Sequence, residues 1–140
     1  MKLLFALILT FATHTLFAQS SDALAKGKNV YVMQTSANDN VKDYKDDAIA
    51  AIKDWGYWNV VDTKENADII FDLKADSHKG ITITSWGGQT VSLNVALLSK
   101  SGEKLWQSET YETSPNGTNG FNGGKGSLRK LIRNLKKKFN

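Results

Sequence analysis

Two long segments of the chain alternate apolar and polar residues, and this alternation constrains the fold more than any other feature of the sequence. In residues 68–76, alternate positions carry Ile69, Phe71, Leu73 and Ala75. In residues 91–97, alternate positions carry Val91, Leu93, Val95 and Leu97. A repeat of two residues is the side-chain repeat of a β-strand, so both segments are predicted to be strands with one buried face and one wet face. An apolar sheet face needs a second layer to cover it.

Shorter segments add further strands and a helix. Residues 29–35, rich in β-branched and aromatic side chains, predict the first strand. Apolar residues recur at helical spacing from Val41 to Trp55, with Asn40 as the candidate N-cap and Gly56 as the stop. Further strands are predicted in segments 58–63 and 104–113, and residues 81–86 alternate Ile with Thr before a turn candidate at Gly87-Gly88.

The clearest helical pattern lies at the end of the chain. Its apolar residues follow the spacing i, i+3, i+4, i+7, i+11 and are Leu128, Leu131, Ile132, Leu135 and Phe139. Ser127 is the predicted N-cap. The element order is therefore β-α-β-β-β-β-α. We predict an α+β fold with two layers, a mainly antiparallel sheet with two helices on one face.

Length and composition indicate one exported domain. A chain of 140 residues fits a single domain. The absence of cysteine excludes disulfides, thiolate zinc sites, a cysteine nucleophile and a lipid anchor on cysteine. Residues 1–18 combine Lys2, an apolar run and Ala18 before Gln19, which predicts a cleaved signal peptide, with a retained anchor as the alternative. Residues 19–140 would then form a periplasmic or secreted domain.

Charge is divided unevenly along the chain, whose formal net charge is +4. Residues 19–124 carry 10 Lys and Arg against all 14 Asp and Glu, a net −4, whereas residues 125–140 carry seven cations and no acid. This division indicates either complementarity within the chain or a basic tail that meets an anionic partner. Nucleic acid is not an expected partner, because the protein is exported and its remainder is acidic.

The basic residues of the last helix are the first candidate binding site. They are Arg129, Lys130, Arg133, Lys136 and Lys137. One interpretation packs the helix on the sheet with a solvated basic back; the other lays it in a membrane interface or against an anionic partner. A second candidate is aromatic: Trp86 and Trp106 could stack on sugar rings, while Trp55 and Trp58 are predicted to lie in the core.

Three other patterns are weaker. Residues 114–126 hold five of the 11 glycines and predict a flexible surface loop; Gly126 follows Lys125 where a phosphate-binding loop needs Ser or Thr, so no nucleotide or other cofactor is expected. A metal site of Asp72, Asp76 and His78 is not expected either, because the two carboxylates lie roughly 13 Å apart along a strand. The sequence Asp76-Ser77-His78 cannot align as a catalytic triad on an extended chain, whose neighbouring side chains point to opposite faces.

Several segments together resemble a known group of proteins. They are NVYVMQT, AIAAIKDWGYWNVVD, ENADIIFDLKAD and the hairpin VSLNVALLSKSGEKLWQSETYE, followed by a helix ending in KKKF. This arrangement is similar to small bacterial envelope domains, including uncharacterised periplasmic lipoproteins, the N-terminal domain of TolB and the periplasmic part of curli-secretion lipoproteins. The resemblance implies a two-layer fold and a non-catalytic envelope role, and it supplies no catalytic residues.

The sequence thus predicts an exported accessory or binding protein whose partner is an envelope protein, a glycan or an anionic membrane surface. The alternative from another class is a hydrolase acting on envelope polymers with Asp72 and Asp76 as its acids. An enzyme should bring two such acids together in a cleft, whereas a binding protein should present a flat or aromatic-lined surface.

Overall fold

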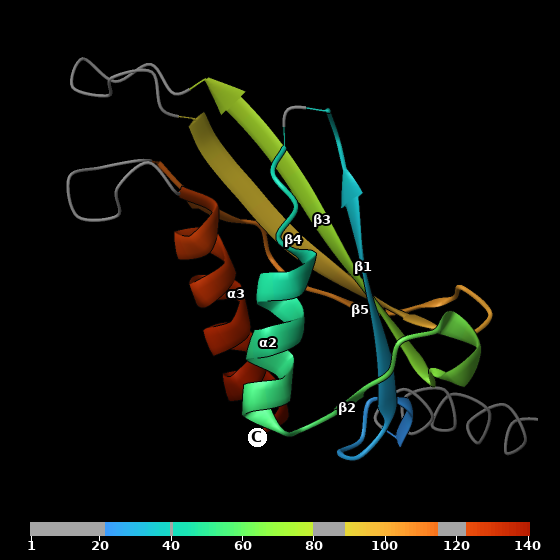
Figure 1. Ribbon diagram of the computed structural model, residues 1–140. Coiled ribbons are helices and arrows are strands. Elements are labelled where there is room, and N and C mark those ends of the chain that lie inside the picture. The colour runs from blue at the N-terminus through green and yellow to red at the C-terminus, as the bar shows by residue number, and fades with distance from the viewer. Residues whose placement is uncertain (1–21, 40, 80–88, 115–122) are drawn as a thin grey trace, which may run out of the picture.

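The computed structural model describes residues 22–39, 41–79, 89–114 and 123–140. Figure 1 shows two layers, a twisted sheet and two helices that lie side by side on one of its faces. The strands are β1 (Asn29–Ser36), β2 (Asn59–Val60), β3 (Ile69–Lys79), β4 (Gln89–Ser99), β5 (Lys104–Gln107) and β6 (Tyr111–Thr113). The helices are α2 (Lys45–Trp55), α3 (Gly123–Phe139) and a short 3-10 helix, η1 (Lys64–Asn66). The predicted two-layer α+β fold is confirmed.

The strands form one mixed sheet that is mainly antiparallel. Its order is β2-β1-β3-β4-β5, and β6 pairs with β4 beside β5. β1 runs parallel to β2 and β3, whereas the pairs made by β4 are antiparallel. The central pair is the longest, and its register runs from Ile69 opposite Ser99 to Lys79 opposite Gln89. This register brings the two alternating apolar rows of the sequence onto the same face.

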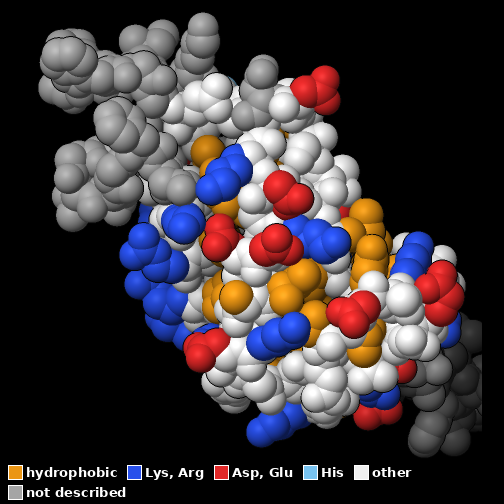
Figure 2. All heavy atoms as spheres, viewed as in Figure 1, with side chains coloured by type: hydrophobic (Ala, Val, Ile, Leu, Met, Phe, Trp, Pro, Cys, Tyr) orange, Lys and Arg blue, Asp and Glu red, His pale blue; other side chains and the backbone are white. Residues whose placement is uncertain are grey.

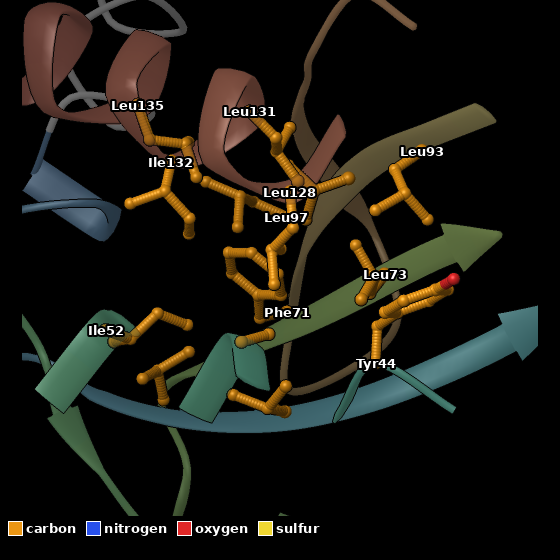
Figure 3. Close-up of a cluster of buried hydrophobic side chains, with 14 of the residues drawn as sticks. Tyr44, Ile52, Phe71, Leu73, Leu93, Leu97, Leu128, Leu131, Ile132 and Leu135 are labelled. Carbon is orange, nitrogen blue, oxygen red and sulfur yellow. The ribbon is translucent and has the colours of Figure 1, made fainter. Parts of the chain in front are cut away.

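The core lies between this face and the two helices (Figure 3). From α3, Leu131 and Leu135 point at the sheet and are 0% exposed. Phe71 and Leu97 meet them from β3 and β4, and Ile52 meets them from α2. The side chains that α2, α3 and the sheet contribute to this core are all apolar, so their burial is the main stabilising contribution.

The opposite face of the sheet is only partly wet, which differs from the prediction. Lys74 and Asp76 are exposed there, but Ile70 is 1% exposed and Ala96 is 2% exposed. The register places Ile70 between Tyr31 and Leu98, whose side chains flank it on both sides. A central strand position can therefore be buried by its neighbours within the sheet, without a third layer.

The start of α3 corrects the prediction for the glycine-rich segment. The helix begins at Gly123, so the predicted loop does not extend through residues 123–126, and residues 115–122 lie outside the described part of the chain. Ser127 is not an N-cap: it is fully buried inside the helix, where its hydroxyl donates to the carbonyl of Val91 at 2.8 Å. The glycines permit this start because the Tyr44 ring packs so close to Gly124 that a Cβ there would overlap it.

The boundaries of α2 also differ at one end. The helix begins at Lys45, whose N–H donates to the Asp43 carboxylate at 2.8 Å, while the N–H of Tyr44 donates to the Gln34 side chain at 2.7 Å. The predicted cap, Asn40, lies outside the described residues. Gly56 ends the helix as predicted, with a left-handed φ of 67° that favours glycine.

Two predicted strands change as well. Segment 58–63 contributes only Asn59–Val60, because Trp58 turns into the core and its indole N–H donates to the carbonyl of Leu24 at 3.2 Å. Segment 104–113 divides into β5 and β6, since the Ser108 hydroxyl accepts the N–H of Val95 and interrupts the ladder. Among the described residues, five strands therefore follow α2 where four were predicted, and the alternating segment 81–86 lies outside the described residues.

Candidate basic face and helix groove

The outward side of α3 carries the predicted cations, and we call these five residues the basic face. Arg129, Lys130, Arg133 and Lys137 are exposed and Lys136 is half-buried. The apolar side of the same helix is in the core, with Leu128 5% and Ile132 7% exposed. Figure 2 shows Lys and Arg side chains gathered along this helix, at the left of the view. The structure therefore packs α3 on the sheet and leaves its charged side accessible.

The basic face has no carboxylate partner in the described part of the chain. No Lys or Arg of α3 comes within 4.0 Å of an acid among these residues, and every one of the 14 Asp and Glu residues belongs to them. The one short contact between a basic and an acidic side chain in the described residues joins His78 Nε2 and Glu112 Oε1, at 3.6 Å on the surface. Lys130 donates to the backbone carbonyl of Glu112 instead, at 3.0 Å. The positive charge of α3 is thus not neutralised by ion pairs with the acidic residues of the rest of the chain.

A groove of about 370 Å³ runs between α2 and α3, and we call it the helix groove. Its apolar floor is formed by Ala51, Leu128 and Ile132. Its rim on α3 is cationic and consists of Lys125, Arg129, Arg133 and Lys136. Asp47 lies on the α2 side. The groove exists because α2 presents the small side chain of Ala51 where a larger one would close the gap between the helices.

The helix groove divides the basic face into two parts. Residues 125, 129, 133 and 136 are three or four positions apart and so share one stripe of a helix. Lys130 and Lys137 lie outside the groove lining. The sequence predicted the five cations as one group and did not indicate Lys125, Ala51 or Asp47 as part of the site. The spacing from 125 to 136 was a usable signal for the stripe, but the partner residues on α2 depend on how the two helices pack.

The aromatic candidates are only partly placed. Trp106 is half-buried and its ring meets Phe139 edge-on, with 5.5 Å between centroids. Trp58 is buried in the core as predicted, and Trp55 stacks on Tyr57 at 4.9 Å. Trp86 lies outside the described residues. Trp106 therefore joins an intramolecular aromatic cluster, and the described residues do not pair it with Trp86.

The carboxylates of the alternative enzyme do not converge. Asp72 accepts a hydrogen bond from the Thr35 hydroxyl at 2.8 Å, and Asp76 accepts one from the Asn38 amide at 2.9 Å. Both acids are thus held by β1 or the segment after it, four residues apart along β3. Neither lines the helix groove. In the described ranges, no three His, Asp or Glu residues gather as a metal site would require.

Comparison with known proteins identifies the fold. Neither a family model nor a curated protein matches the chain. Among solved structures, it is similar to PelC from Paraburkholderia phytofirmans, a dodecamer, at 18% identity and a TM-score of 0.53, over 81% of this chain and 87% of PelC. A point variant of the same protein gives a TM-score of 0.55 at 18% identity, over 81% of this chain and 91% of that one.

Lipoproteins of unknown function are also among the structural neighbours. One is uncharacterized lipoprotein B from Nitrosomonas europaea, at 13% identity and a TM-score of 0.44, over 83% of this chain and 81% of that one. Lipoproteins are thus among the proteins to which this chain is similar, as the sequence segments predicted. At these identities the likeness concerns the fold.

The helices that the structure describes are too short or too polar to cross a membrane. The predicted signal peptide, residues 1–18, lies outside the described residues and stays a prediction.

Proposed function

We propose that this chain is an exported, non-catalytic protein of the bacterial envelope that binds an anionic membrane surface through the basic face of α3. One observation carries the proposal. The apolar side of α3 is buried on the sheet, while the five cations of the basic face lie on its other side without a carboxylate partner among the described residues. Cations that serve only solubility are usually interspersed with acids, and α3 contains no acid.

The expected binding is electrostatic, weak and reversible. Each Lys or Arg held near an anionic membrane contributes about 1 kcal/mol. Five such residues would contribute at most about 5 kcal/mol, which corresponds to a dissociation constant of the order of 0.1–1 mM. The apolar residues of α3 add nothing in this account, because they stay in the core.

Support for a binding role over the hydrolase comes from the geometry of Asp72 and Asp76. Each carboxylate accepts a hydrogen bond from its own neighbour on the β1 side, and neither faces the helix groove. Two acids that share a reaction must approach the same substrate bond, at separations of roughly 5–9.5 Å in glycoside hydrolysis. Their spacing of roughly 13 Å along β3 is larger than this range.

The test is co-sedimentation of residues 19–140 with vesicles at low salt. We expect binding to phosphatidylcholine vesicles that contain about 30 mol% of the anionic lipid phosphatidylglycerol. We expect no binding to vesicles of phosphatidylcholine alone. The triple variant Lys130→Gln, Arg133→Gln, Lys137→Gln should bind at least about ten-fold more weakly, since it loses three of five cations.

The matched control removes the same charge elsewhere. It replaces three exposed lysines outside α3 by glutamine: Lys64, Lys74 and Lys104. We expect this control to bind nearly as well as the unmodified protein. Equal losses in both triple variants would show that only net charge matters and would overturn the assignment to α3.

A further inference from the structure

The helix groove has a shape and a charge pattern that the proposed function does not use. A flat anionic surface touches only the outermost cations, whereas the groove reaches inward to the slightly exposed Leu128 and Ile132. Its apolar floor is continuous with the core, and its open side is edged by charge. An aqueous groove of this kind leaves apolar surface in contact with water, at a free-energy cost that an apolar occupant would remove.

The charge at the rim is strongly one-sided. Four cations line the α3 side and Asp47 faces them from α2. Arg129 and Arg133 are four positions apart, so they are neighbours on the helix surface. Two adjacent guanidinium groups suit a single carboxylate or phosphate, which each can bind in a bidentate manner. The Arg129 Nε makes only a long contact of 3.4 Å, to the carbonyl of Lys125.

We propose that the helix groove binds a single-chain anionic amphiphile of the fatty-acid class. The acyl chain would lie on Ala51, Leu128 and Ile132, and the acidic head would lie between Arg129 and Arg133. A volume of about 370 Å³ is at the lower end of the range for small-molecule sites, roughly 300–1,000 Å³, and this favours one chain over the two chains of a phospholipid. The inference deepens the proposed function, because it assigns a ligand class to the same basic face.

The probe is dodecanoate, titrated below its micellar concentration without vesicles and followed by calorimetry. We expect saturable binding at one site per chain. A cationic amphiphile with the same chain length, dodecyltrimethylammonium, should bind at least ten-fold more weakly, because it meets the cationic rim.

Two pairs of variants locate the site. Ala51→Phe fills the groove floor and should weaken dodecanoate binding at least ten-fold, whereas Ala50→Phe adds the same ring at an exposed position of α2 and should not. Arg133→Gln removes a rim cation and should weaken binding several-fold, whereas Lys138→Gln removes an equal charge at an exposed position outside the groove and the basic face and should not. Because Arg133 is exposed, this second pair remains informative if Ala51→Phe fails to fold.

The outcomes separate this inference from the proposed function. Absence of saturable dodecanoate binding, or equal losses in Arg133→Gln and Lys138→Gln, would overturn the inference and leave vesicle binding as a separate result. A second outcome combines vesicle binding that Ala51→Phe abolishes with no binding of free dodecanoate. It would show that the groove takes a chain from a two-chain lipid, and it would also overturn the inference. Dodecanoate binding that only Ala51→Phe and Arg133→Gln weaken would support it, whether or not vesicles are bound.

Discussion

Gly124 lies where the first turn of α3 packs against the Tyr44 ring, and its replacement by alanine is a sharp test of this contact. A Cβ on this residue would overlap Cζ, Cε1 and the hydroxyl oxygen of the Tyr44 ring. Tyr44 is 3% exposed and precedes α2 directly, so the ring cannot turn away into solvent without leaving the core. The substitution therefore forces either the ring or the first turn of α3 to move.

The magnitude follows from two opposing contributions. Overpacking a buried site costs about 1–3 kcal/mol, occasionally more. Alanine is favoured over glycine inside a helix by at most about 1 kcal/mol, and less in the first turn. The packing cost is the larger contribution, so Gly124→Ala should lower the free energy of unfolding by a net of roughly 0.5–2.5 kcal/mol.

The assay is urea unfolding followed by circular dichroism. Lys125→Ala, at the exposed neighbouring position, is the control and should change stability by no more than about 0.5 kcal/mol. In a Tyr44→Leu background the overlapping ring atoms are gone, so the added Gly124→Ala should become neutral or stabilising. If Gly124→Ala were equally costly with and without the ring, the contact with Tyr44 would not be the cause and the reasoning would be refuted.

Three further predictions concern the core and its titration. Leu93→Ala should cost about 2–5 kcal/mol, because its side chain is 0% exposed, whereas urea unfolding of Ser92→Ala, on the other face, should show little change. Deleting residues 127–140 uncovers the sheet, so the truncated chain should show no cooperative melting transition; an unchanged melting temperature would contradict the packed helix. Burial, and to a smaller extent the charge of Asp47, raise the pKa of Tyr44 above 10.0. The unfolded chain therefore loses the Tyr44 proton at a lower pH than the folded protein does, and stability falls as the pH rises above about 10. Tyr44→Phe should lose less stability than the unmodified protein in urea titrations between about pH 9 and pH 11.

The layers of the fold could be predicted because they depend on local periodicity. The alternation in β3 and β4 and the apolar stripe of α3 each identify one buried face, and these faces have to meet. The burial of Ile70 on the other face could not be predicted in this way, because it depends on the neighbours that pairing supplies, Tyr31 and Leu98. Periodicity within one strand does not reveal the sizes of side chains on the adjacent strands.

The start of α3 illustrates why local propensity failed. Glycine disfavours helix, so Gly123 and Gly124 indicated a loop. In the structure, Gly124 is where Tyr44 packs against the helix backbone, a contact between positions 80 residues apart in the sequence. A close approach of this kind overrides propensity and cannot be seen from the glycine segment alone.

The candidate site was predicted in part, for the same reason. The five cations share a helix, so the spacing in the sequence was enough to place them together on its outward side. The helix groove needs Ala51 and Asp47 from α2, which contact the site only through the packing of two helices on one sheet. Trp86 and Trp106 showed no such spacing, and Trp106 is instead engaged with Phe139.

The measurement that tests the central claim most directly is the dependence of anionic-vesicle binding on ionic strength. The claim is that α3 stays packed on the sheet and meets an anionic membrane only through the charges of its basic face. Screening shortens from about 30 Å at 0.01 M salt to about 8 Å at 0.15 M, so we predict clear binding at low salt that fades towards physiological salt. Binding that persists undiminished at a physiological salt concentration of about 0.15 M would show that apolar residues of α3 enter the membrane. That result would contradict the account.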